Sequence, residues 1–120
     1  MSSSKPKIPS LFKAVGVSFC QKAISKLEKG NIVSIRWDSE NKYDKNALEI
    51  LNSEGGRCGF VPRKFKLEDG SEIELNQLVK KKLEKLQKKY DFVVSEIYQW
   101  DGPTGFEIRF DKKTLKNQDS

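Results

Sequence analysis

Apolar and polar positions alternate in several short stretches, and these stretches predict a chain built mostly of β-strands. The clearest is Ile32-Val33-Ser34-Ile35-Arg36-Trp37, which alternates as a half-buried strand does. Gly16, inside the stretch 11–17, indicates a bulge or a close backbone approach, and Pro62 ends the stretch 57–62. The predicted strands cover residues 11–17, 32–37, 47–51, 57–62, 92–100 and 106–110.

Two other stretches have helical spacing. Residues 21–29 form a weak helical pattern, which Gly30 is expected to end as a C-cap. A longer helix is expected to follow Ser71, because Ser71 and Glu74 have the spacing of a capping box. Its apolar stripe consists of Leu75, Leu78, Val79, Leu83, Leu86 and Tyr90. We therefore predict a mainly β fold with accessory α: a small OB-like or SH3-like barrel of about six strands, with one long and one short helix.

The connector between the second and third predicted strands is unusually polar for its length. Residues 38–46 contain acids, asparagines and Tyr43. Short Asp and Asn side chains satisfy the backbone of turns, which explains most of this composition. A polar connector that also carries an aromatic ring is a common place for binding residues, so the connector is the first candidate site.

Composition and charge bound the class of protein. The chain has 120 residues, a size for one domain, with a net charge of +6 that favours an anionic partner, nucleic acid before acidic membrane. No apolar run approaches the roughly 20 residues that span a bilayer, and we expect no membrane partner. Cys20 and Cys58 are interpreted as free core thiols of an intracellular protein. With no histidine, we expect neither a metal nor a cofactor. The expected divisions are a disordered arm (1–10), a domain (11–111) and a polar tail (112–120).

Three motifs resemble one known family. They are Val15-Gly16-Val17, then Arg36-Trp37-Asp38-Ser39-Glu40-Asn41-Lys42-Tyr43-Asp44-Lys45-Asn46-Ala47-Leu48, then Gly59-Phe60-Val61-Pro62-Arg63. In this order and spacing they are similar to the HIRAN domain family, over roughly residues 11 to 110. The resemblance implies an OB-like barrel that captures the free 3′ end of single-stranded DNA in DNA repair or at replication forks. We also expect a monomer, a helicase or repair protein as partner, and a nuclear location in a eukaryote or a cytoplasmic one otherwise.

Carried over position by position, the resemblance implies a pocket built from four parts of the chain. They are Ser18 and Phe19 after the first strand, Tyr43 and Asp44 in the connector, Phe60 with Arg63 around the fourth strand, and Phe106 on the last strand. Three of these positions depart from the best-understood member: Ser18 replaces a basic residue, Phe19 a tyrosine and Phe60 an imidazole. Base stacking tolerates all three changes, whereas a phosphate contact and two polar contacts do not.

The expected roles follow from the chemistry of each side chain. An ionised Asp44 that accepts from a terminal hydroxyl would gain on the order of 1.5–3 kcal/mol, and it would repel a 3′-phosphate. Tyr43, Phe19 and Phe106 would stack on bases, each for roughly 1–3 kcal/mol. Backbone phosphates are expected at Arg63 and Lys64, with Lys66 beside them.

Each of these residues also has a structural interpretation. Asp44 alone would more commonly cap a turn and pair with Lys45 or Arg36. Phe106 alternates with Ile108 and Phe110 as core residues do, and Phe60 is as suited to the core as to a rim. The lysines of the long helix are read first as a solvated face, which can still attract DNA at long range.

Two rival functions stay open. One is a protein-interaction barrel without nucleic-acid binding, with an exposed strand edge that takes a peptide. The other is a metal-dependent nuclease that uses Asp38, Glu40, Asp44 and Glu49, for which the chain has few of the usual catalytic groups. We predict a non-enzymatic domain that binds single-stranded DNA ends.

Overall fold

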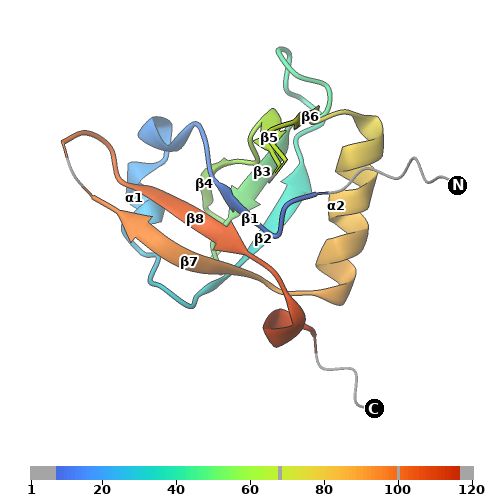
Figure 1. Ribbon diagram of the computed structural model, residues 1–120. Helices are drawn as coiled ribbons and strands as arrows, with labels where there is room; N and C mark the ends of the chain where they lie inside the picture. The colour runs from blue at the N-terminus through green and yellow to red at the C-terminus, as the bar shows by residue number, and fades with distance from the viewer. Residues whose placement is uncertain (1–7, 68, 100, 117–120) are drawn as a thin grey trace, which may run out of the picture.

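The computed structural model describes residues 8–67, 69–99 and 101–116. Its strands and helices, in chain order, are β1 (Leu11–Lys13), η1 (Val17–Phe19), α1 (Gln21–Ile24), β2 (Ile32–Trp37), β3 (Leu48–Leu51), β4 (Arg57–Phe60), β5 (Lys64–Lys66), β6 (Glu72–Glu74), α2 (Gln77–Lys89), β7 (Phe92–Tyr98), β8 (Gly105–Arg109) and η2 (Lys112–Thr114). Six strands form one antiparallel sheet in the order β1-β8-β7-β2-β3-β4, and β5 and β6 form a separate pair. Figure 1 shows α2 beside the sheet, and the β7–β8 hairpin extends on the side away from α2.

The two outer strands of the large sheet meet, and this contact closes the sheet into a barrel. Val15, just after β1, and Phe60, at the end of β4, exchange N–H···O bonds of 2.9 and 2.8 Å. A sheet closed on itself leaves no unpaired edge at the closure. The predicted mainly β fold and small barrel are thus confirmed.

Two glycines make this closure possible. A Cβ on Gly59 would lie 2.8 Å from the Val15 carbonyl oxygen, closer than van der Waals contact allows. Gly16 adopts φ 68°, a left-handed conformation suited to glycine, and a Cβ added there would lie 3.2 Å from the Phe60 ring. The close backbone approach predicted at Gly16 is therefore confirmed.

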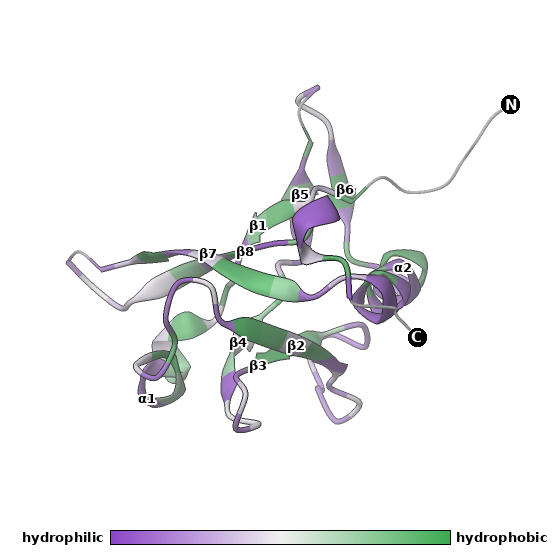
Figure 2. Cartoon of the chain, turned by 90° about the horizontal axis from the view of Figure 1, so that it is seen from below, coloured by the Kyte–Doolittle hydropathy of each residue, from purple (hydrophilic) through white to green (hydrophobic). Residues whose placement is uncertain are grey.

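Aromatic rings fill the centre of the molecule. Phe12 contacts Phe65 edge-on at 5.6 Å between centroids, and Phe92 stacks on Phe110 at 4.9 Å. Both arrangements are favourable for aromatic pairs, and all four rings are buried. Figure 2 shows β2 and β7 coloured as hydrophobic over much of their length, and α2 as largely hydrophilic.

Helix α2 completes the barrel wall where the strands diverge. β2 pairs with β7 only at Ile32 and Val33. Further along β2, the Gln87 side chain accepts from the Ile35 N–H at 2.6 Å and donates to the Ile35 carbonyl at 3.1 Å. The amide of Gln87 thus supplies the two bonds that a neighbouring strand would otherwise make.

The expected start of the long helix is wrong. Residues 72–74 form β6, which pairs with β5 through Phe65 and Ile73, so Ser71 and Glu74 are not a capping box. The helix begins at Gln77, and the side-chain oxygen of Asn76 accepts from the Val79 N–H at 2.9 Å. Leu78, placed in the apolar stripe by spacing, is 67% exposed.

Two further boundaries differ from the expectation. α1 ends at Ile24, and Gly30 instead donates to the Val94 carbonyl at 2.8 Å, so it is not a helix C-cap. The first strand stops at Lys13, because the chain turns to reach the closure.

Part of the expected tail is ordered structure. Lys112–Thr114 form η2, with a complete capping box at Asp111, and the Asp91 N–H donates to the Thr114 carbonyl. Residues 117–120, and residues 1–7 of the expected arm, lie outside the described part.

Both cysteines are free and buried, as predicted. Burial raises the pKa of the Cys58 thiol to about 11, with the nearby Cys20 thiol as a second cause. Within the described residues, no helix is long and apolar enough to cross a membrane.

Candidate nucleic-acid interface

The connector after β2 is held in shape by its own short polar side chains. The Asn41 side-chain oxygen accepts from the N–H groups of Tyr43 and Asp44, both at 2.9 Å. One oxygen of Asp44 accepts from the Asn46 N–H at 2.9 Å. Trp37 fixes the far side, since its ring N–H donates to the Lys45 carbonyl at 2.9 Å. Asparagine and aspartate therefore define the loop, as the sequence predicted.

Tyr43 projects from this loop into solvent. Its exposed fraction is 93%, although the backbone on both sides of it is fixed. A large aromatic ring at that exposure gains nothing from the core. The geometry leaves both faces of the ring open to a flat ligand.

Asp44 is partly buried and has an arginine beside it. Its second oxygen lies 3.7 Å from Nε of Arg63, and the exposed fractions of the two side chains are 17% and 76%. The structural interpretation is thus half right: Asp44 does cap a turn, but its ionic partner is Arg63 rather than Lys45 or Arg36. This Arg63 comes from the segment after β4, so the contact joins the connector to the fourth strand.

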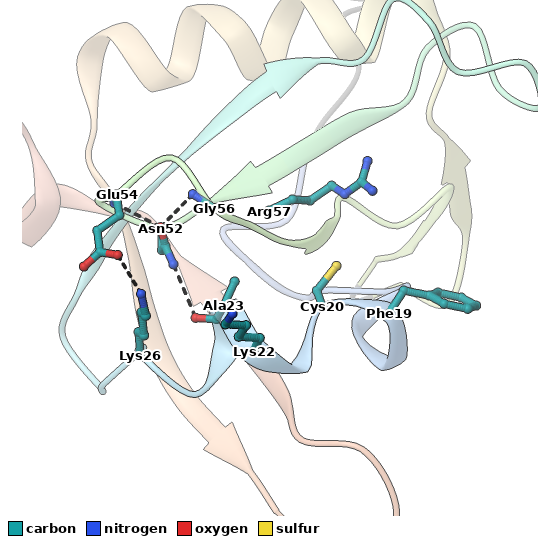
Figure 3. A pocket seen from close by; sticks show the side chains of 9 residues that line it. All are labelled: Phe19, Cys20, Lys22, Ala23, Lys26, Asn52, Glu54, Gly56 and Arg57. Atoms are coloured by element: carbon teal, nitrogen blue, oxygen red, sulfur yellow. Dashed lines mark hydrogen bonds and ion pairs between the residues drawn. The ribbon is translucent and has the colours of Figure 1, made fainter.

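Phe19 is another strongly exposed ring. It ends η1 and is 90% exposed, and Ser18 before it is also exposed. Beside Phe19 lies an open hollow of about 320 Å³. Figure 3 shows Phe19 projecting at one end of this hollow, with Arg57 reaching across from β4. The hollow is lined by Phe19, Cys20, Lys22, Ala23, Lys26, Asn52, Glu54, Gly56 and Arg57.

The outer face of the sheet carries an arginine pair that the sequence patterns did not predict. Glu49 lies opposite Arg36 in β2 and opposite Phe60 in β4, so these side chains share one face. Glu49 accepts from Arg36 at 2.7 Å and lies 3.6 Å from Arg57. Two guanidinium groups against one carboxylate leave this face positively charged.

Phe60 links this face to η1. The Arg57 guanidinium lies 5.2 Å from the centre of the half-buried Phe60 ring, a cation–π contact, and Gly16, the N-cap of η1, lies close beside the same ring. Only the irregular register at Ile50 and Leu51 brings Arg57 and Phe60 together, because residues three apart on a regular strand face opposite sides. Sequence alternation alone therefore gave no signal for Arg57.

Phe106 requires a correction. Its side chain is 1% exposed and belongs to the core cluster, so the ring is closed to a base. The alternation with Ile108 and Phe110 was the better guide. Lys64 is exposed on β5, and neither Tyr43 nor Asp44 lines the hollow beside Phe19.

The acids named for a nuclease do not form a metal site. Among the described residues, no group of three or more Cys, Asp or Glu side chains could hold a metal ion. Glu49 is engaged by Arg36 and Arg57, and Asp44 by Arg63.

Comparison with known proteins gives one match. The model of the HIRAN domain matches residues 10–95, which is most of the chain and includes all of the predicted site residues except Phe106. No curated protein and no solved structure matches.

Proposed function

The chain belongs to the HIRAN domain family, and from that premise we propose that it captures single-stranded DNA at a free 3′-hydroxyl end. HIRAN domains are DNA-binding modules, and they bind rather than catalyse. The proposal extends this general role to a particular strand end, to a repair or replication-fork setting, and to named residues of this chain.

The observation that carries the proposal is the pairing of a fully exposed ring with a half-engaged carboxylate. Tyr43 is 93% exposed, and Asp44 next to it has one oxygen bound to the Asn46 N–H. Among the residues that the structure describes, the other oxygen meets only Arg63, at 3.7 Å, which is too long for a hydrogen bond. A hydroxyl that donates to this oxygen would make a charge-assisted bond, whereas a terminal phosphate would be repelled.

The cationic groups fit the backbone just before such an end. Arg63 has a 76% exposed side chain next to Asp44, and Lys64 follows it. Arg63 beside the carboxylate can turn toward a phosphate without losing packing. Phe19 and the Arg57–Phe60 pair offer further stacking surface along the strand.

The test compares two oligonucleotides that differ only at the 3′ end, a hydroxyl or a phosphate, by fluorescence anisotropy. We expect the hydroxyl strand to bind about tenfold more tightly, which corresponds to about 1.4 kcal/mol. Asp44→Asn keeps an oxygen for the Asn46 N–H but removes the charge, so it should bring the ratio of the two affinities close to one.

The matched control is Glu40→Gln, which removes one carboxylate from the same connector at an exposed position. It should leave the ratio unchanged. Equal affinity of the unmodified domain for both strands would overturn the proposal.

A further inference from the structure

One side of β1 carries backbone groups that its own sheet does not use. Phe110 donates to the Ser10 carbonyl, and Ala14 donates to the Phe106 carbonyl, each at 3.0 Å. Along an antiparallel strand, successive residues direct their backbone N–H and C=O groups to opposite sides. Since Ser10 and Ala14 bond toward β8, the even-numbered residues of this segment are the ones that face β8. The N–H and C=O groups of Leu11 and Lys13 therefore point away from β8.

The same alternation applies to β5. Leu75 donates to the Arg63 carbonyl at 2.7 Å, and Leu67 donates to the Ser71 carbonyl at 2.8 Å. The residues that bond toward β6 are thus the odd-numbered ones. Lys64 and Lys66 direct their N–H and C=O groups away from β6.

A proline explains why these two edges do not pair with one another. Val15 pairs with Phe60, and continuing that antiparallel register would place Lys13 opposite Pro62. Pro62 has no N–H to give to the Lys13 carbonyl, so the ladder stops there. β1 and β5 separate at this point, and a hollow of about 270 Å³ lies between them.

The hollow has an apolar base and a cationic rim. Buried Phe12 and Phe65, in contact at 5.6 Å, lie beneath it. Lys13, Lys64 and Lys66 are exposed along it, and none of the three forms an ion pair with a described residue. The Lys13 ammonium lies 5.0 Å from the centre of the Tyr98 ring. Its full lining is Pro9, Leu11, Phe12, Lys13, Val15, Pro62, Lys64, Phe65 and Lys66.

We propose that this groove binds an extended segment of a partner protein, one that alternates apolar with acidic residues. Its main chain would pair with the open groups of Leu11 and Lys13, or of Lys64 and Lys66, as in strand addition. Side chains facing inward would cover Phe12 and Phe65, and those facing outward would meet the lysines.

Charge selects the occupant of the groove. Lysines on an open edge discourage pairing with ordinary strands, and an acidic strand is the one they admit. Each lysine also has a glutamate directly opposite it in its own strand pair: Glu107 faces Lys13, Glu74 faces Lys64 and Glu72 faces Lys66. The contribution of charge to the affinity for an acidic segment is therefore modest. A nucleic-acid strand fits less well, because its phosphates can accept from the open N–H groups but offer no donor to the open carbonyl oxygens.

The test is a ¹H–¹⁵N NMR titration of the full chain with a short synthetic peptide that alternates valine with glutamate. We expect shifts at the amides of Leu11, Lys13, Lys64 and Lys66. A peptide with lysine in place of glutamate should bind about tenfold more weakly. A peptide with alternate amides N-methylated keeps every side chain, and it should fail to bind.

A charge-reversed variant distinguishes a lost contact from misfolding, because a misfolded protein would not gain affinity for the lysine peptide. The double variant Lys13→Glu and Lys66→Glu should reverse the preference and select the lysine peptide, while Lys85→Glu on α2 should change nothing. Shifts confined to other residues, no binding, or full binding of the N-methylated peptide would overturn the inference. It does not depend on DNA capture, since Tyr43→Ala should leave the peptide titration unchanged.

Discussion

Tyr43 stands in solvent because the residues around it are held by side chains rather than by packing. Asn41 binds the N–H groups of Tyr43 and Asp44, and Asp44 binds that of Asn46. The ring is thus positioned by a rigid loop without being buried itself. Such a ring is pre-organised for a ligand at little entropic cost.

Replacement of Tyr43 by alanine should weaken binding of all single strands, whatever their 3′ end. The loss should be about 1–3 kcal/mol, the usual contribution of one base–aromatic stack. Tyr43→Phe keeps the ring and should bind nearly as the unmodified protein does. Because Tyr43 is 93% exposed, neither change should alter the urea midpoint. An unchanged dissociation constant for Tyr43→Ala, measured by anisotropy, would remove Tyr43 from the site.

Gly59 should be indispensable to the barrel closure. In Gly59→Ala the added Cβ would meet the Val15 carbonyl oxygen at 2.8 Å, and backbone atoms cannot move aside as a flexible side chain can. We expect a loss of about 1–3 kcal/mol in the free energy of unfolding, measured with urea. The control is Gly105→Ala in β8, where the nearest atom lies 3.9 Å away. Equal stability of the two variants would contradict this account of the closure.

At the scale of elements, helix α2 starts where tertiary pairing allows, and not at the earlier capping signal. Residues 72–74 pair with β5, and in this pairing the apolar Ile73 lies opposite the buried Phe65. The local signal at Ser71 and Glu74 loses to this pairing. The helix then begins at Gln77, directly after Asn76, the next residue able to cap it.

This assignment of the cap can be tested by stability. Asn76→Ala removes the acceptor of the Val79 N–H and should lower the free energy of unfolding by about 1 kcal/mol. Ser71→Ala removes only an exposed bond to Asp69 and should have a much smaller effect. If Ser71→Ala were the more costly change in urea unfolding, the cap would lie where the sequence pattern placed it.

Much of the fold could be predicted from alternation, and the rest depended on contacts that alternation does not encode. The runs from Ile32 to Trp37 and from Phe92 onward are strands as predicted. The hairpin of β5 and β6 escaped prediction, because three-residue strands are too short to show a period. For the candidate site, the motif identified Tyr43 and Asp44, but Arg57 required the irregular register of β3 with β4.

At the scale of the whole molecule, most of the positive charge is carried by residues other than the proposed end-binding ones. Helix α2 and residues 111–116 together hold nine lysines and two acids, a net charge of +7 against +6 for the chain. Lys81, Lys85 and Lys88 are exposed along α2. This lysine face is suited to attracting a polyanion from a distance, and in the proposed function the residues around Asp44 would then recognise its end.

The triple variant Lys81→Gln, Lys85→Gln and Lys88→Gln should therefore slow association with single-stranded DNA several-fold at low salt. The effect should vanish as salt screens exposed charges beyond roughly 10 Å. Dissociation rates, and the preference for a 3′-hydroxyl, should not change. Stopped-flow kinetics at several salt concentrations give all three quantities. A lost end preference would show that the lysine face belongs to the site itself.

The central claim is that this domain recognises where a DNA strand stops. The most direct measurement is a ¹H–¹⁵N NMR titration that follows the amides of Tyr43 and Asp44 with three ligands. These are a linear strand with a 3′-hydroxyl, the same strand with a 3′-phosphate, and a circular single strand. The account predicts large shifts at both amides with the first ligand and small ones with the other two. Equal shifts with all three ligands, or none with the 3′-hydroxyl strand, would contradict it.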